Sequence, residues 1–168
     1  MKKIKIIALM GPAGSGKDYL LHEAIETDKT KPSRSLHEII SCTTRPPREG
    51  EKDGVNYHFI TKEEVENNKD KFLELTEFRD WYYGTRYEDL DEEKINVGVF
   101  NPAGVRKLLK NENLNVKVFW VKASDKIRLQ RQLAREENPD IEEIIRRYQT
   151  DKEDFSNIDF LYETIDNG

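Results

Sequence analysis

Residues 11–18 read Gly-Pro-Ala-Gly-Ser-Gly-Lys-Asp and carry two glycines and a lysine at the spacing of a phosphate-binding loop. In such a loop the glycines let backbone N–H groups curl around a phosphate, and the lysine ammonium reaches the outer phosphates. Apolar residues 4–10 predict a buried strand before the loop, and residues 19–25 predict an amphipathic helix after it. A glycine-rich turn with a chance lysine is the alternative, which the flanking elements disfavour. The residues expected to bind nucleotide phosphates are Gly11, Ala13, Gly14, Ser15, Gly16 and Lys17.

Asp18 departs from this pattern, in which serine or threonine follows the lysine and its hydroxyl ligates magnesium. A carboxylate at this position places negative charge near the β-phosphate unless a cation lies between them. Two interpretations stay open. Either Asp18 binds nucleotide-associated Mg²⁺, directly or through water, or the site has lost part of its original chemistry.

The composition bounds the rest of the chain. Its 168 residues fit one domain, and no linker-like or low-complexity segment indicates a second one. Charged residues make up 36% of the chain and the net charge is -5. Without a strong basic block, sequence-independent binding to nucleic acid is disfavoured.

Cysteine and histidine usage indicates no metal centre. The single cysteine, Cys42, excludes an internal disulfide and a cysteine-based cluster. His22, His37 and His58 share no metal-ligand spacing, so we interpret them as structural or surface residues. The apolar run at the N-terminus is too short for a signal peptide or a membrane span, which predicts a cytoplasmic protein without a membrane partner.

A second group of chemistry-bearing residues lies in residues 41–51, Ser-Cys-Thr-Thr-Arg-Pro-Pro-Arg-Glu-Gly-Glu. Arg45 and Arg48 stand three apart in a turn that its prolines stiffen and keep out of a helix interior. Two guanidinium groups held close together suit a dianionic phosphate, because arginine binds it bidentately and stays charged. A solvated basic turn is the alternative for this pair taken alone.

Three further segments follow this turn: residues 53–59, Asp-Gly-Val-Asn-Tyr-His-Phe, residues 72–74, Phe-Leu-Glu, and residues 82–85, Tyr-Tyr-Gly-Thr. A helix-like stretch, residues 62–69, separates the first two. In order, residues 41–48 and these three segments resemble the S-x-T-T-R-x-P-R, D-G-x-x-Y-x-F, F-x-E and Y-Y-G-[ST] signatures of the guanylate kinase family. With the phosphate loop, the resemblance covers residues 4–85.

The resemblance implies a monophosphate-binding lobe. Its phosphate-binding residues would be Arg45, Arg48, Tyr57 and Tyr83, and its guanine-binding residues Ser41, Glu74 and Thr85. The chemistry agrees, since a Glu74 carboxylate can accept hydrogen bonds from guanine N1–H and N2–H₂. Adenine presents the wrong edge and would leave buried groups unpaired at a cost of about 1–3 kcal/mol. We interpret Tyr82 as a core aromatic residue.

The C-terminal half predicts the remainder of an α/β core. Residues 96–100 and 116–121 are buried-strand candidates with a helix-like stretch, residues 103–110, between them, which is the pattern of a parallel sheet. Residues 159–165 could supply a last strand. Ser124 and Asp125 begin a further helix.

This helix and the next one carry arginines, which resemble those of the family's helical lid. The resemblance implies that Arg131, Arg135 and Arg147 reach the phosphates of the donor. The glycine-bearing lid turn of the family is replaced here by residues 135–139, Arg-Glu-Glu-Asn-Pro. A solvated helix face is the alternative for each arginine taken alone.

Two departures from the family concern the third main strand. Where guanylate kinases carry D-x-D-x-x-G, residues 99–104 read Val-Phe-Asn-Pro-Ala-Gly, and both aspartates are absent. The connection from Thr85 to that strand is also short, which trims the expected helix around residues 88–93. We hypothesise that Asp18 restores one carboxylate near the metal.

Together these features predict a single α/β domain over residues 1–168, with the three-layer fold of phosphate-loop kinases and a central parallel sheet. The expected core comprises residues 1–40 and 94–168, the inserted monophosphate-binding lobe residues 41–88, and the lid residues 131–146. The expected activity is transfer of a phosphoryl group from ATP, with Mg²⁺, to GMP or dGMP. The expected catalytic residues are Lys17, Arg45, Arg131, Arg135 and Arg147. A non-catalytic binding module and a kinase with another nucleoside monophosphate acceptor are the alternatives.

Overall fold

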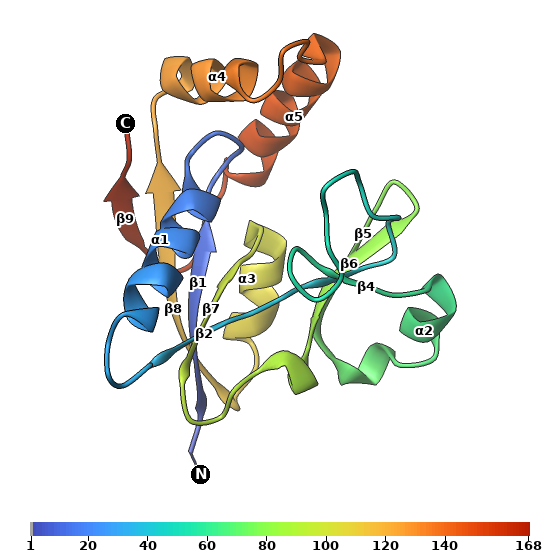
Figure 1. Cartoon of the computed structure of the whole chain (residues 1–168), viewed down its shortest axis with the longest axis vertical. Helices are drawn as coiled ribbons and strands as arrows, with labels where there is room; N and C mark the ends of the chain where they lie inside the picture. The colour runs from blue at the N-terminus through green and yellow to red at the C-terminus, as the bar shows by residue number, and fades with distance from the viewer. Residues whose placement is uncertain (1) are drawn as a thin grey trace.

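The computed structural model describes residues 2–168 and contains two sheets that lie side by side (Figure 1). The larger sheet has the order β2-β7-β1-β8-β9, and every neighbouring pair in it is parallel. Its strands are β1 (Ile4–Met10), β2 (Leu36–Glu38), β7 (Ile95–Val99), β8 (Leu114–Lys122) and β9 (Glu163–Asp166). The expected central parallel sheet is therefore confirmed.

The alternating side chains of β1 divide the core between the two faces of this sheet. Ile6 and Met10 pack with residues of α3 (Pro102–Leu109) on one face, whereas Leu9 packs with residues of α1 (Lys17–Lys29) on the other. Helices on both faces of a parallel sheet explain why its strands read as nearly continuous apolar runs. The result is the predicted three-layer α/β fold.

The smaller sheet has the order β4-β3-β6-β5. In the sequence, its strands lie between β2 and β7, which pair with each other in the large sheet. It comprises β3 (Cys42–Thr43), β4 (His58–Phe59), β5 (Phe72–Phe78) and β6 (Trp81–Arg86), with β5 and β6 forming an antiparallel hairpin. Helix α2 (Lys62–Glu66) covers it and begins at a capping box between Thr61 and Glu64. This unit coincides with the segment expected to form the monophosphate-binding lobe.

Several elements differ in extent from the sequence expectation. The stretch expected as one helix over residues 62–69 ends at Glu66 and is followed by a 3₁₀ turn, η1 (Lys69–Lys71), because Asn68 Nδ2 donates to the Glu64 carbonyl in place of a backbone donor. The last strand is shorter than residues 159–165, since only Glu163–Asp166 pairs with β8. Residues 88–93 contain a single 3₁₀ turn, η2 (Tyr87–Asp89), as the short connection predicts.

Two helices, α4 (Asp125–Ala134) and α5 (Ile141–Asp154), lie beyond the carboxyl ends of the strands, beside the loop that follows β1 (Figure 1). The Ser124 hydroxyl caps α4, and the Asp140 carboxylate caps α5 by accepting from Glu143 N at 3.2 Å. The expected lid thus corresponds to the end of one helix, a loop and the start of the next. Within residues 2–168, no helix is long and apolar enough to cross a bilayer.

Asn96 fixes the return of the chain from the small sheet to the large one. Its side chain is fully buried on β7, accepts from Asp91 N at 2.8 Å and donates to Asp91 O at 2.8 Å. It also donates to Lys5 O on β1 at 3.1 Å. One amide therefore ties the connecting segment to the central strands.

We expect Asn96→Leu to destabilise the fold by about 2 kcal/mol, because the Asp91 backbone groups lose their buried partners. The melting temperature should fall by about 4–8 °C, measured by calorimetry. Asn115→Leu on β8, the strand on the other side of β1, is the matched control, since Asn115 is exposed. Equal melting temperatures of the two variants would contradict the role given to Asn96.

Candidate active site

The loop between β1 and α1 has the backbone shape that its glycines predict. Gly14 and Gly16 adopt positive φ values of 81° and 89°, and Gly16 is the N-cap of α1. A Cβ atom on Gly14 would lie 2.5 Å from the Arg128 carbonyl oxygen, and one on Gly16 would collide with Asn167 Nδ2. Both positions therefore require glycine. The first N–H groups of α1 have no intrahelical partner and are free to bind an anion.

Donors from the C-terminal half hold the carbonyl groups of this loop. Arg128 Nε donates to Ala13 O at 3.1 Å, Arg131 Nη1 to Gly14 O at 3.0 Å, and Asn167 Nδ2 to Ser15 O at 2.9 Å. The carbonyl oxygens would repel a phosphate, and these contacts neutralise them. The loop is consequently supported by α4 and by the chain end after β9.

Arg131 thus lies at the predicted site, but its side chain supports the loop. Its Nη2 also donates to Asn167 O at 2.6 Å. Sequence reasoning missed three partners of the loop, Arg128, Asp151 and Asn167. Arg128 stands three residues before Arg131, so helical spacing was the signal that could have found it.

Asp151 joins α5 to the phosphate loop. Its Oδ2 accepts from Ala13 N at 2.9 Å and lies 3.8 Å from Arg128 Nη2. Two buried donors at the loop, Ser15 Oγ and Arg128 Nη2, have no hydrogen-bond partner within residues 2–168. Unpaired buried donors beside a glycine-rich turn fit an anionic ligand, and the phosphates of a nucleotide have that character.

Positive charge surrounds Lys17. Its side chain is only 15% exposed, and its pKa is lowered, first by burial and also by Arg147 and Arg135. Asp18 and Asp151 oppose this shift. Two of the arginines expected to reach the donor phosphates therefore act on the same ammonium group.

Asp18 is an exposed carboxylate in the first turn of α1, next to Lys17. Its Oδ2 stands 3.7 Å from Lys17 Nζ and its side chain is 74% exposed. It is also among the charges that raise the pKa of Tyr57, after burial and Tyr83. The Asp18 carboxylate is therefore within electrostatic range of the small sheet.

Arg45 is held in place by a carboxylate that sequence reasoning missed. Its Nη1 and Nη2 donate to Glu51 Oε1 and Oε2 at 2.8 and 3.0 Å, and Nη1 also donates to Pro46 O at 3.0 Å. Three of the five guanidinium N–H groups are therefore engaged, which leaves two for a ligand. The Arg45 hydrogen bonds lower the pKa of Glu51 to about 2, so the pair stays ionised.

Two tyrosines lie beside Arg45. The Tyr57 ring lies 5.4 Å from Arg45 Cζ and packs edge-on against Tyr83 at 6.2 Å. Arg48 is exposed, and its backbone N–H donates to Glu51 at 2.7 Å. Arg45, Tyr57 and Tyr83 are thus brought together, while the Arg48 side chain extends into solvent next to them.

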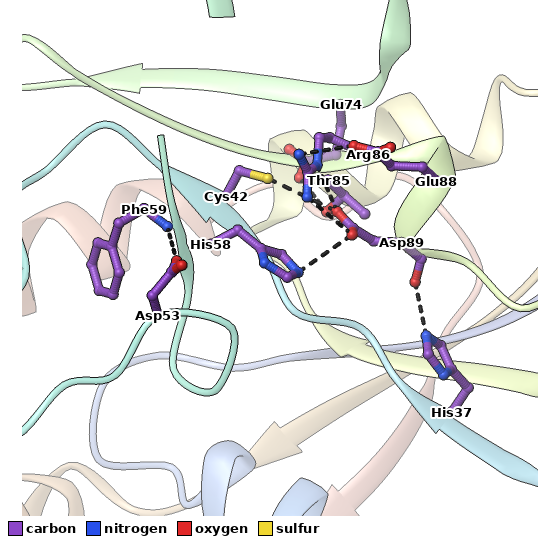
Figure 2. Close-up of polar contacts among 10 residues, drawn as sticks. All are labelled: His37, Cys42, Asp53, His58, Phe59, Glu74, Thr85, Arg86, Glu88 and Asp89. Carbon is purple, nitrogen blue, oxygen red and sulfur yellow. Dashed lines mark hydrogen bonds and ion pairs between the residues drawn. The ribbon is translucent and has the colours of Figure 1, made fainter. Parts of the chain in front are cut away.

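Glu74 and Thr85 face each other on β5 and β6, where Thr85 Oγ1 donates to Glu74 Oε1 at 3.0 Å (Figure 2). The backbone of Gly104, in the first turn of α3, lies close to this carboxylate, because a Cβ atom on Gly104 would stand 3.3 Å from Glu74 Oε2. Burial raises the pKa of Glu74, against the Thr85 hydrogen bond and the charge of Lys107. Ser41 precedes β3, and its carbonyl accepts from His58 N at 2.9 Å.

Asn101 stands where the family pattern has an aspartate, and its side chain caps α3. Its Oδ1 accepts from Gly104 N at 2.7 Å. Within residues 2–168, no group of three or more His, Cys, Asp or Glu side chains could hold a metal ion. Asp18 is therefore the carboxylate nearest Lys17, while Asp151 is engaged by the loop backbone at Ala13 N.

Asp89 gathers a separate polar cluster, where the small sheet meets the edge of the large one (Figure 2). Its carboxylate accepts from Arg86 Nε at 2.9 Å and lies 3.3 Å from His58 Nε2, while its carbonyl lies 2.8 Å from His37 Nε2. Cys42 Sγ donates weakly to the same carboxylate, and burial raises the pKa of the thiol to about 12. These contacts give His37 and His58 the structural role predicted for them.

Comparison with known proteins identifies this arrangement. Residues 3–167 match the family described as Guanylate kinase. The guanylate kinase of Campylobacter jejuni (strain RM1221) is 30% identical over 165 residues, which cover 93% of this chain and 78% of that protein. The guanylate kinase of Prochlorococcus marinus (strain MIT 9312) is 41% identical over 96 residues, or 56% of this chain and 49% of that protein.

A solved structure shares the fold. The guanylate kinase from Anaplasma phagocytophilum superposes with a TM-score of 0.68 at 18% identity, covering 99% of this chain and 78% of that one. The family match over nearly the whole chain confirms the predicted enzyme class, a nucleoside monophosphate kinase. The chain belongs to the guanylate kinase family.

Proposed function

We propose that this protein transfers the γ-phosphoryl group of ATP to GMP or dGMP. The observation that carries the proposal is the presence of two sites suited to anions, the phosphate loop with its unpaired buried Ser15 Oγ, and the corner of the small sheet where Arg45 lies against Tyr57. Phosphoryl transfer requires the attacking and leaving oxygens to lie roughly in line between donor and acceptor. Two anion sites in one domain support such a reaction.

The acceptor is proposed to bind on the small sheet. Its phosphate would contact Arg45, Arg48, Tyr57 and Tyr83, and its base would contact Ser41, Glu74 and Thr85. Glu74 is the residue on which guanine recognition depends. Its Oε1 already accepts from Thr85, and its remaining acceptor positions suit guanine N1–H and N2–H₂.

The donor is proposed to bind at the loop, with Lys17 at its outer phosphates and Arg135 and Arg147 approaching from the helical pair. Arg131 serves this site by holding the Gly14 carbonyl away from the phosphates. No dedicated general base is required, because positioning and charge neutralisation supply most of the catalysis. Closure of the small sheet and α5 over the nucleotides would exclude water.

The site suits a Mg²⁺ ion that is bound mainly by the phosphates of ATP. Mg²⁺ in phosphoryl-transfer sites is usually held by one or two carboxylates, substrate phosphates and water, and Asp18 offers one exposed carboxylate beside the loop. When bound, Mg²⁺ adds positive charge between the outer phosphates.

The acceptor assay tests the proposal directly. We expect ADP release from ATP and Mg²⁺ to be stimulated by GMP and dGMP, with kcat/KM at least about 100-fold above that for AMP, UMP or CMP. A preference for AMP would refute the roles of Ser41, Glu74 and Thr85. ATP binding without stimulation by any acceptor would instead indicate a binding module.

We expect Asp18→Asn to raise the Mg²⁺ concentration required for half-maximal activity by about tenfold, because one anionic ligand is lost. Calorimetry of ATP binding at several Mg²⁺ concentrations, without acceptor, should show the same shift. Glu23→Gln is the control, since Glu23 is an exposed carboxylate on the same helix. Identical Mg²⁺ dependence of wild type and Asp18→Asn would refute the compensation hypothesis.

The raised pKa of Glu74 predicts a pH dependence of acceptor use. The ionised carboxylate accepts from guanine, so kcat/KM for GMP should be constant above this pKa and fall as the pH drops through it. Because burial raises the pKa, the fall begins at a higher pH than for an ordinary glutamate.

Glu74→Gln is the matched variant for the pH profile. Its amide does not titrate, so this limb of the profile should disappear while kcat/KM drops at every pH. The same limb persisting in Glu74→Gln would assign the titration to another group.

A further inference from the structure

The tip of the β5–β6 hairpin touches α5, which belongs to the other half of the site. The two residues at the tip, Arg79 and Asp80, adopt positive φ values of 50° and 66°. Phe78 pairs with Trp81, so these are the two central residues of a tight hairpin turn, in which positive φ at both positions matches the twist of the strands. From this turn the side chain of Arg79 reaches α5.

Arg79 Nη2 lies 3.2 Å from Glu143 Oε2 on α5. Glu143 is also bound by Arg146 one turn along the helix, and the guanidinium of Arg146 stands 5.3 Å from the ring centroid of Phe78. Arg146 and Arg79 lower the pKa of Glu143 to about 2, so the cluster stays ionised at neutral pH. We call these four residues, Phe78, Arg79, Glu143 and Arg146, the clasp.

The clasp connects the two proposed substrate sites. On the hairpin side, β5 carries Glu74 and β6 carries Tyr83 and Thr85. On the helix side, Arg147 follows Arg146 and acts on Lys17. Neighbouring residues of an α-helix project about 100° apart, so holding Arg146 against the hairpin fixes the direction of Arg147.

We propose that the clasp couples acceptor binding to donor binding, and that Arg79 and Glu143 are positioning residues for Arg147. The proposal rests on the proposed function for the identity of the two ligands. The clasp already holds hairpin and helix together in this structure, and each ligand would favour further approach of the element it binds. The clasp therefore stabilises the state in which both ligands are enclosed.

The expected strength of the coupling depends on how exposed the charged groups of the clasp are. The side chains of Arg79 and Glu143 are 54% and 39% exposed, so their attraction is screened by water. Arg146 strengthens the clasp through its contact with the Phe78 ring and its hydrogen bond to Glu143. We expect the clasp to change coupling by about threefold to tenfold, within the range of measured allosteric factors.

The test compares Arg79→Ala with Lys117→Ala. Lys117 reproduces the same interactions away from the site, with an ion pair to Glu163 at 3.2 Å and its ammonium 5.4 Å from the Phe119 ring centroid. GMP affinity is measured by calorimetry with and without a non-hydrolysable ATP analogue. The ratio of the two affinities should fall about threefold to tenfold in Arg79→Ala and stay unchanged in Lys117→Ala.

Arg79→Lys retains a positive charge and should recover part of the ratio. If Arg79→Ala keeps the wild-type ratio, the coupling role is overturned. Absence of GMP binding to the wild type would instead refute the proposed function.

A second measurement needs no nucleotide. Amide hydrogen exchange over α5 should be faster in Arg79→Ala than in wild type, because the helix loses its contact with the hairpin. If α5 exchanges as slowly in Arg79→Ala as in wild type and Lys117→Ala, the clasp does not stabilise the helix and the proposal is overturned, whichever ligands the protein binds.

Discussion

The positive charge gathered at the phosphate loop is the constraint on which the rest of the structure depends. Lys17 is largely buried, and Arg135 and Arg147 oppose its ionisation further. Asp18 and Asp151 offset part of this repulsion, and Asp151 also binds the loop backbone at Ala13 N. A nucleotide's phosphates would complete the balance. The site is therefore built to be stabilised by an anionic ligand.

This constraint explains the division of labour among the arginines. Arg128 and Arg131 neutralise loop carbonyls, whereas Arg135 and Arg147 are the ones that act on Lys17. Arg45 acts at the opposite side, where Glu51 holds its guanidinium in a fixed orientation. A guanidinium fixed in this way loses little freedom when a phosphate binds.

The sequence predicted the elements whose signals are local. The loop glycines and the parallel arrangement of the central strands follow from residue type and spacing, whereas the expectation for Glu74 and Thr85 came from the family resemblance. The partners Glu51, Asp151 and Asn167 could not be read in the same way. Asp151 and Asn167 reach the loop from over a hundred residues away, and Glu51 depends on the path of an irregular turn. Their contacts are properties of the folded chain.

The central claim is that a donor site and a guanine-specific acceptor site face each other. The most direct test is the binding of a molecule in which adenosine and guanosine are joined by five phosphates. Because both halves would bind at once, its affinity should exceed that of ATP or GMP alone by about 100-fold or more. The affinity of this compound should also exceed the affinity of the compound in which two adenosines are joined by five phosphates. Affinity no tighter than that of ATP would contradict the account.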